Sequence, residues 1–172
     1  MIRPATHADA RRMAEITVSA WQVAYEDFIP AELRAAQNVA RQERFFEFAV
    51  QDESARTWVS DNDGVVLGFA HIAEARDVDV DPDVTAELWA MYVDPQHMGQ
   101  GIGSALMTTA IDSMTTHGFQ EAVLWVLRGN TRARSFYASH RWSDDDTSRT
   151  ISTDSGFELA EVRYRLALAD SD

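Results

Sequence analysis

The chain has 172 residues, no cysteine and a formal net charge of −13. Its length fits one domain better than two, and the lack of cysteine excludes disulfides, thiolate metal sites and cysteine nucleophiles. The acidic balance argues against nucleic-acid binding, because basic side chains must replace the counterions around phosphate. It is compatible with a cationic small substrate, since an acidic surface attracts amines, and equally with solubility or a saline habitat.

We expect no targeting or membrane signal in this sequence. The N-terminus, Met1-Ile2-Arg3-Pro4, has no apolar signal region, and no stretch approaches the roughly 18 apolar residues that would span a bilayer. We therefore expect a cytoplasmic protein with no membrane partner. No repeat, linker or change in composition marks a boundary, so we expect a single domain over residues 1–172 that ends in a short tail from about residue 168.

Hydrophobic periodicity and turn residues predict the elements in chain order. They are a strand at 2–5, a helix at about 6–20, an aromatic-rich segment at 21–29, a helical group at 31–50, strands at 57–60, 65–73 and 88–93, a helix at about 101–117, a strand at 122–127, a helix at 131–140, and strands at about 142–147 and 158–168. A turn at 61–64 predicts a hairpin, and the acidic runs 77–83 and 144–146 predict solvated loops. The order β-α-α-β-β-β-α-β-α-β-β is typical of an α/β fold with a mixed sheet.

Three alternating glycines, Gly99, Gly101 and Gly103, follow a buried strand and precede a helix. Amides at a helix N-terminus lack partners within the helix, and glycine allows close approach to an anion, so a pyrophosphate is the expected guest. The Walker pattern is absent because no Lys-Ser or Lys-Thr pair follows the glycines, and the dinucleotide fingerprint fails at Ser104 or Leu106. From the loop alone, a tight turn without a ligand remains an alternative.

Two segments carry a more specific signal. Glu87 to Leu106 joins a strand ending in Val-Asp-Pro to the glycine loop and an apolar helix, and Asn130 to Tyr137 reads Asn-Thr-Arg-Ala-Arg-Ser-Phe-Tyr. They resemble the central motif and the Asn-x-x-Ala-x-x-x-Tyr segment of the GCN5-related N-acetyltransferase (GNAT) family. The resemblance covers about residues 56–142 well and the N-terminal third more loosely. It departs at Met98, where the family usually has Arg or Gln, and we expect weaker cofactor binding there rather than none.

The resemblance implies a GNAT-like single domain, in which helices flank a mixed, mostly antiparallel sheet. It implies acetyl-CoA as the co-substrate without a metal, and direct attack on the thioester by a primary amine of a small molecule, peptide or protein. It also implies that a homodimer is an expected assembly. A different class remains open, namely a catalytically weak acyl-CoA-binding sensor or interaction module on the same fold.

The resemblance further implies which residues hold the co-substrate. The backbone of Met91 and Val93 pairs with the pantetheine arm, and the Val93 amide is the expected oxyanion donor. Asn130 contacts the pantetheine or orients the cofactor, and Arg134 either reaches the adenosine phosphate or is an ordinary exposed arginine. The implied cofactor-binding residues are Met91, Tyr92, Val93, Met98, Gly99, Gln100, Gly101, Ile102, Gly103, Ser104, Asn130, Arg134 and Tyr137.

Acyl transfer to an amine requires that the ammonium loses a proton and that the thiolate gains one. Tyr137 matches the family's tyrosine and is the candidate acid, with a core tyrosine beside Phe136 as the alternative. Glu87 opens the central strand, where related enzymes often carry a glutamate, and is the candidate base through water. The alternative is an ordinary carboxylate at a strand end. His71 and His140 are weaker candidates for the base.

Four aromatic residues are candidates for an acceptor pocket. They are Trp21, Tyr25, Phe28 and Trp125. An aromatic wall suits a cationic or aromatic amine. Core packing is the alternative, and we favour it for at least two of the four.

Overall fold

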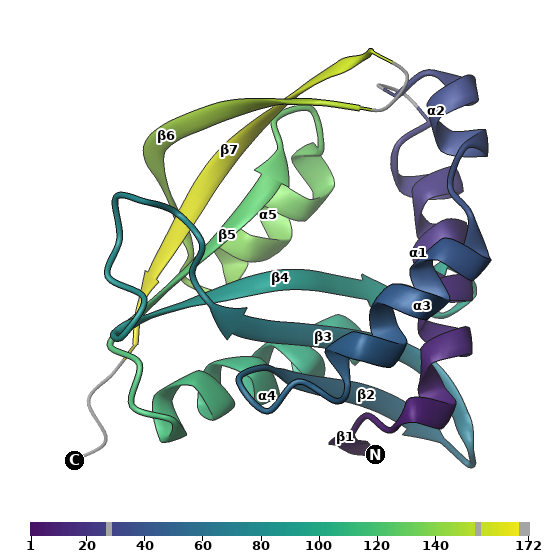
Figure 1. Cartoon of the computed structure of the whole chain (residues 1–172), viewed down its shortest axis with the longest axis horizontal. Coiled ribbons are helices and arrows are strands. Elements are labelled where there is room, and N and C mark those ends of the chain that lie inside the picture. The colour runs from purple at the N-terminus through teal and green to yellow at the C-terminus, as the bar shows by residue number, and fades with distance from the viewer. Residues whose placement is uncertain (27–28, 154–155, 169–172) are drawn as a thin grey trace.

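The computed structural model describes residues 1–26, 29–153 and 156–168, and its strands form one seven-stranded sheet (Figure 1). The spatial order is β1-β2-β3-β4-β5-β7-β6, and only the β4–β5 pair is parallel. The elements are β1 (Ile2–Pro4), α1 (Ala10–Ala24), α2 (Ala31–Ala35), α3 (Val39–Ala49), β2 (Arg56–Asn62), β3 (Val65–Glu74), β4 (Thr85–Val93), α4 (Ile102–Thr116), β5 (Glu121–Leu127), α5 (Thr131–Ser139), β6 (Ser143–Ser152) and β7 (Glu158–Ala167). The predicted mixed, mostly antiparallel sheet is confirmed, whereas the single-domain boundary stays a prediction.

The hairpin predicted around residues 61–64 is confirmed as the β2–β3 turn. Asn62 pairs with Val65, which leaves Asp63 and Gly64 as the two turn residues. Their φ angles are 52° and 86°. Two-residue turns of this kind need positive φ at both central positions, which explains the Asp-Gly pair in the sequence.

Two elements extend further than the sequence predicts. The first helix was expected to end near Ala20 but continues to Ala24, which places Trp21 and Tyr25 one turn apart with their rings 4.7 Å from each other. The strand expected at 142–147 continues to Ser152, because residues 148–152 pair with 158–162 of β7. In both cases long-range packing or pairing determines the boundary, and local propensity is too weak to reveal it.

The prediction that both acidic runs are solvated loops is wrong for the carboxylates of Asp77 and Asp145, which are only 14% and 15% exposed, whereas Asp79 is 55% exposed. Asp77 and Asp79 lie in the β3–β4 loop and Asp145 lies in β6, and all three accept hydrogen bonds from the guanidinium of Arg163 on β7. Arg163 is only 3% exposed. A buried cation is tolerated only when carboxylates surround it. These aspartates therefore stabilise the fold by neutralising the guanidinium of Arg163.

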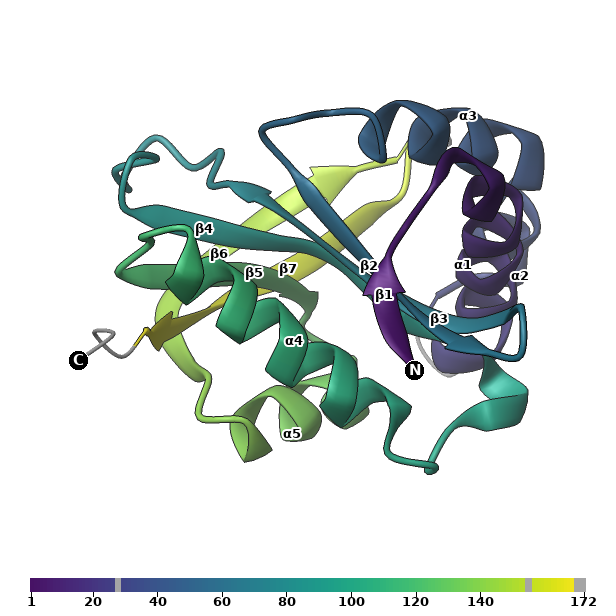
Figure 2. The ribbon, with the colours of Figure 1, turned by 90° about the horizontal axis from the view of Figure 1, so that it is seen from below.

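Helices cover both faces of the sheet (Figure 2). On one face, α1 and α3 pack in an apolar cluster that contains Met13, Phe46 and Phe69. On the other face, α4 and α5 pack in the cluster that contains Leu106 and Met114. Different helices thus cover the two faces of the sheet. This arrangement determines the walls of the site, because two central strands of the sheet separate.

The opening lies between β4 and β5. These strands pair only at Thr85–Glu87 with Glu121–Val123, close to the start of each strand. Further along, β4 pairs with β3 alone, and its register shifts so that Trp89 is an extra residue between two aligned positions. Such a bulge bends a strand and increases its twist. The carboxyl ends of β4 and β5 therefore diverge and leave a crevice of the kind in which ligands bind in α/β sheets.

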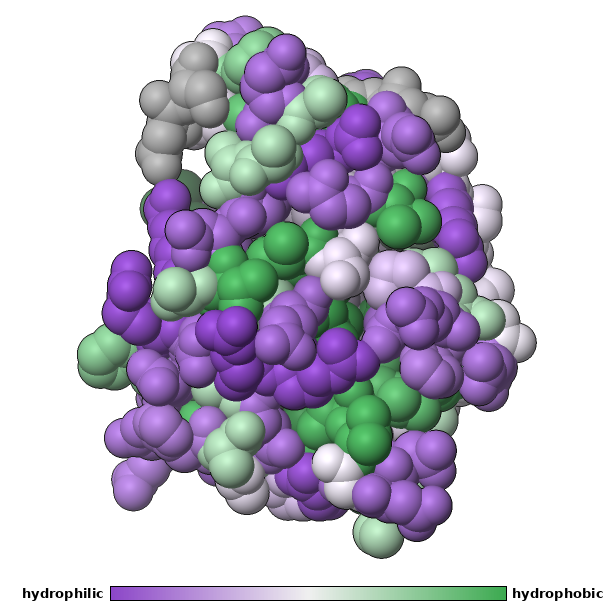
Figure 3. All heavy atoms as spheres, turned by 90° about the vertical axis from the view of Figure 1, so that its right-hand side faces the viewer, coloured by the Kyte–Doolittle hydropathy of each residue, from purple (hydrophilic) through white to green (hydrophobic). Residues whose placement is uncertain are grey.

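The helical side of the molecule meets solvent mainly through polar residues (Figure 3). Figure 3 views the side that carries α1, α2 and α3, where apolar side chains form small patches between polar ones. The large exposed apolar side chains of these helices include Val23, Phe45 and Phe48. Within the described residues, no helix combines the length and apolar character needed to cross a membrane.

Candidate active site

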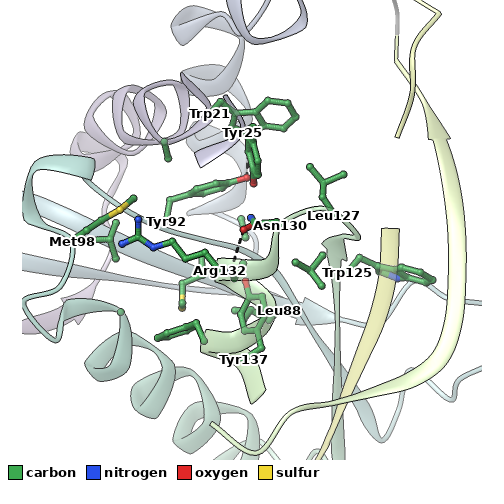
Figure 4. Close-up of a pocket in the computed structure, with 18 of the residues that line it drawn as sticks. Trp21, Tyr25, Leu88, Tyr92, Met98, Trp125, Leu127, Asn130, Arg132 and Tyr137 are labelled. Carbon is green, nitrogen blue, oxygen red and sulfur yellow. Dashed lines mark hydrogen bonds between the residues drawn. The ribbon is translucent and has the colours of Figure 1, made fainter. Parts of the chain in front are cut away.

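A cavity of about 640 Å³ lies where β4 and β5 diverge (Figure 4). The predicted site residues that line it are Trp21, Tyr25, Met91, Tyr92, Val93, Met98, Gly99, Gly101, Ile102, Gly103, Ser104, Trp125, Asn130 and Tyr137. Glu87, Gln100 and Arg134 are outside this lining. The prediction for Phe28 concerns a residue outside the described part of the chain. Because α1 and α5 both contribute, the cavity has walls from both faces of the sheet.

The start of α4 forms one wall and offers free backbone donors. No amide from Gly99 to Ser104 donates to an acceptor among the described residues, and the first that does is Ala105, 3.0 Å from the carbonyl of Gly101. Gly99 and Gly101 have φ of +78° and +80°, where an L side chain is strained. A row of unpaired amides at the positive end of a helix is the geometry that binds phosphate groups.

Gly103 lies in the first turn of α4, where the helix packs against α5. A Cβ atom at this position would lie 3.4 Å from the ring of Phe136, which is an ordinary packing distance. This contact brings the amide row of α4 and the side chains of α5 to the same cavity.

The arginine that lines the cavity is Arg132, and Figure 4 shows its side chain reaching toward Met98. Arg132 makes no hydrogen bond or ion pair with another described residue, whereas Arg134 is engaged elsewhere. The Arg134 Nε donates to the hydroxyl of Tyr164 at 3.1 Å, and its guanidinium lies 3.5 Å from the carboxylate of Asp144. The geometry therefore favours Arg132 over Arg134 as the cation for a phosphate group.

Tyr137 lies on α5, on the opposite side of the cavity from Trp21 and Tyr25 (Figure 4). Burial raises the pKa of its phenol above the ordinary value, so the proton stays on the oxygen at neutral pH. The hydroxyl makes no hydrogen bond with another described residue and is available to a ligand. Asn130 begins α5 as its cap, because its side chain accepts a hydrogen bond from the amide of Ala133 at 3.0 Å.

The candidate bases lie away from the cavity. Glu87 is 2% exposed, and its carboxylate accepts hydrogen bonds from Nη2 and Nε of Arg76 at 2.6 Å and 3.1 Å. His71 is equally buried, pairs with the hydroxyl of Thr57 at 2.8 Å, and has its pKa lowered to about 4 by burial. Neither residue lines the cavity, and neither does His140. Glu87 as the base stays a prediction that this geometry does not favour.

The aromatic candidates form a connected wall on the other side. Trp21 Nε1 donates to the hydroxyl of Tyr92 at 3.2 Å, and a further hydrogen bond joins the side chains of Tyr25 and Tyr92. Trp125 also lines the cavity, but its indole N–H donates to the carboxylate of Asp77 at 3.0 Å. Trp125 is therefore held in place by the acidic loop, while Trp21 and Tyr25 belong to α1 and its end.

Of the described residues in the lining, two charged ones are absent from the sequence-based prediction, namely Arg132 and Glu161. Arg132 lies two positions after Asn130 on the first turn of α5, so the motif itself carried a usable signal. Glu161 had no local signal, because it reaches the cavity only through the pairing of β7 with β5. Among the described residues, no three His, Asp or Glu side chains are grouped so that they could hold a metal ion.

Comparisons with known proteins agree with this fold. Residues 15–141 match the model of the acetyltransferase (GNAT) family. The chain is 26% identical to the uncharacterized N-acetyltransferase YuaI of Bacillus subtilis (strain 168), over 95% of this chain and 88% of that protein. The solved PaiA N-acetyltransferase of Thermoplasma acidophilum, in complex with coenzyme A, has a TM-score of 0.75 and 20% identity over 93% of this chain and 96% of its own. YncA of Salmonella typhimurium, solved with its cofactor acetyl-CoA, has a TM-score of 0.74 and 23% identity over 98% and 94%.

The chain belongs to the GNAT acetyltransferase family, since the family model covers most of its length. The two solved structures are similar in fold. Membership makes the protein an acetyl-CoA-dependent acyltransferase.

Proposed function

We propose that the protein transfers an acetyl group from acetyl-CoA to a primary amine of a small molecule or a peptide by direct attack. The observation that carries this proposal is the cavity between β4 and β5, which joins a phosphate-binding wall on one face of the sheet to an aromatic wall on the other. A donor entering along α4 and α5 and an acceptor entering beside α1 would meet where the strands diverge.

The residues of the α4 side fit acetyl-CoA. The amides from Gly99 to Ser104 and the guanidinium of Arg132 suit the phosphate groups, which are the anionic part of the molecule. Beyond Glu87, the edge of β4 that faces β5 has no strand partner, so the backbone at Met91 and Val93 can pair with an extended pantetheine arm. When bound, the co-substrate supplies a thioester whose carbonyl carbon accepts the amine.

Tyr137 and Val93 carry the proposed chemistry. Water accepts one proton from the ammonium, the neutral amine nitrogen forms a bond to the acyl carbon as the C–S bond breaks, and the second nitrogen proton returns through water to Tyr137. The amide of Val93 donates to the developing oxyanion, and the Tyr137 phenol donates a proton to the leaving thiolate. The raised pKa of Tyr137 suits this task, because the phenol is fully protonated at neutral pH before the thiolate forms.

The experiment measures free thiol with acetyl-CoA and a panel of primary amines, and identifies the product by mass spectrometry. We expect thiol release that depends on the amine, together with the acetylated amine. Because the chain contains no lysine, acetylation of its own side chains cannot produce this signal. Binding of acetyl-CoA without amine-dependent thiol release from any member of the panel would contradict the proposal.

Met98 favours a second function, a sensor or interaction module that binds acyl-CoA and turns over weakly. It places a thioether where the family usually has a phosphate-binding side chain. The same assay separates the two functions, because a sensor would bind acetyl-CoA and show little turnover. A cytoplasmic location and a homodimer stay predictions, which cell fractionation and sedimentation can test.

A further inference from the structure

Among the residues that the structure describes, the acceptor side of the cavity contains one carboxylate. Its wall consists of Trp21, Tyr25, Leu127, Ile151 and Leu159, which are aromatic or aliphatic, together with Glu161. Among the described residues that line the cavity, Glu161 is the only Asp or Glu. An apolar wall with one charged group is the usual form of a small-molecule site, in which the polar group sets the orientation of the ligand.

The position of Glu161 follows from strand register. Glu161 on β7 lies opposite Leu127 of β5 and opposite Arg149 of β6, so all three side chains share one face of the sheet. The Arg149 Nε donates to Oε2 of Glu161 at 2.7 Å. The other oxygen, Oε1, accepts no hydrogen bond from a described residue. One oxygen of Glu161 is thus paired with Arg149 while the other remains available, and the Glu161 side chain is only 13% exposed.

Among the described residues that line this side of the cavity, none is a free cation that could bind an anionic acceptor. Arg149 is used by Glu161 and lies 4.0 Å above the ring of Trp125. Arg163 is surrounded by three aspartates. Arg132 lines the cavity but reaches toward Met98 on the donor side (Figure 4). A carboxylate on the acceptor next to its amine would lie near Glu161 without a partner, and like charges at short range repel strongly in a partly buried site.

We propose that Glu161 binds the ammonium group of the acceptor, and that the acceptor is a monoamine carried on an aromatic or aliphatic group, with no carboxylate beside the amine. A primary amine is mostly protonated at neutral pH, so it arrives as a cation that Oε1 can bind. The aromatic wall then covers the apolar part of the molecule. This inference rests on the proposed function, because it concerns the acceptor of the same site.

The first test measures binding rather than turnover. Phenylethylamine, phenylalanine and spermidine are titrated by calorimetry into the protein saturated with coenzyme A. Phenylethylamine should bind most tightly, and Glu161→Gln should weaken its binding roughly 10- to 100-fold, as expected for the loss of a hydrogen bond to a charged group. Equal binding of all three probes, binding of phenylethylamine unchanged in Glu161→Gln, or no binding of phenylethylamine would overturn the inference.

The second test measures turnover of the same three amines with acetyl-CoA. Glu161→Gln should raise the KM for phenylethylamine roughly 10-fold or more while its affinity for acetyl-CoA changes less than about twofold. Glu158→Gln is the matched control, because Glu158 is an exposed glutamate at the start of the same strand. Glu161→Asp, which keeps the charge, should recover part of the affinity if the carboxylate itself binds the amine.

The outcomes separate this inference from the proposed function. Acetylation of phenylalanine or spermidine as fast as phenylethylamine, unaffected by Glu161→Gln, would leave the proposed function intact and overturn the inference. Phenylethylamine binding that depends on Glu161, with no acetylation of any amine, would support the inference on the acceptor and contradict the proposed transfer.

Discussion

The two sides of the cavity are built in different ways. On the donor side, most of the proposed phosphate ligands come from adjacent residues, as the unpaired backbone amides from Gly99 to Ser104. On the acceptor side, Trp21 comes from α1, Trp125 from β5 and Glu161 from β7, and they meet only after the whole sheet has formed. The donor side depends on backbone conformation, and the acceptor side depends on side chains and ion pairs.

This difference indicates how one fold can keep its co-substrate and change its acceptor. Most side-chain substitutions in the loop leave its backbone amides in place, because only positions with positive φ constrain the residue type. The acceptor wall consists of side chains, so each substitution alters what it binds. Specific recognition belongs to such sites and not to the fold that carries them.

The largest expected effect comes from Tyr137, which faces both sides. Tyr137→Phe should lower kcat roughly 100-fold or more, because the thiolate then leaves without a proton donor. Its affinity for acetyl-CoA should change less than about twofold, because the ring remains. Tyr164→Phe is the control, since Tyr164 packs 6.4 Å from the Tyr137 ring but does not line the cavity. Steady-state kinetics measure kcat for both variants, and an unchanged kcat in Tyr137→Phe would show that Tyr137 is not the proton donor.

On the acceptor side, a large effect on the free energy of unfolding is expected from a change at Arg163. Arg163→Met should lower the free energy of unfolding by about 3–5 kcal/mol, because it removes the buried cation that three clustered aspartates share, two of them only 14% and 15% exposed. Urea denaturation measures this loss. Arg165→Met should cost only about 1 kcal/mol or less, because that side chain is 31% exposed and water screens its ion pairs. Equal losses for the two variants would show that the Arg163 cluster does not hold this side together.

A smaller effect is expected from Arg132, the one cationic side chain that we add to the donor side. Arg132→Met should weaken acetyl-CoA binding roughly 10-fold at low salt, and the difference should shrink as ionic strength rises. Arg128→Met provides the control, since Arg128 is exposed and does not line the cavity. Calorimetry at two salt concentrations measures both. An affinity that is insensitive to Arg132 would leave the amides as the sole phosphate ligands.

Met98 offers the reverse experiment. Met98→Arg should tighten acetyl-CoA binding, because it adds a cation next to Arg132 at the phosphate wall. The gain should be larger in the Arg132→Met background, where no other guanidinium is present. Unchanged or weaker affinity in both backgrounds would count against the placement of this loop at the phosphates.

The same contrast explains what the sequence could predict. The alternating glycines and the Asn130–Tyr137 segment are local patterns, so the fold class, the helix start and Tyr137 were accessible. Glu87 as the base stays a prediction that the sequence alone could not weigh, because its pairing with Arg76 depends on a loop 11 residues away. Glu161 could not be predicted as a site residue, because only strand pairing brings it to the cavity. The contacts around Arg163 could not be predicted either, because Asp79 and Asp77 lie 84 and 86 residues away from it in the sequence.

The most direct test of the account is the acetyl-CoA affinity of two glycine variants. Gly101→Ala and Gly64→Ala both place a methyl group at positive φ with no atom within 4 Å, so both should lose about 1–2 kcal/mol of stability through backbone strain. Only Gly101 belongs to the amide row. Calorimetry should show acetyl-CoA binding weakened roughly 10-fold in Gly101→Ala and unchanged in Gly64→Ala. Equal affinities for acetyl-CoA in the two variants would contradict the claim that the loop before α4 holds the phosphates.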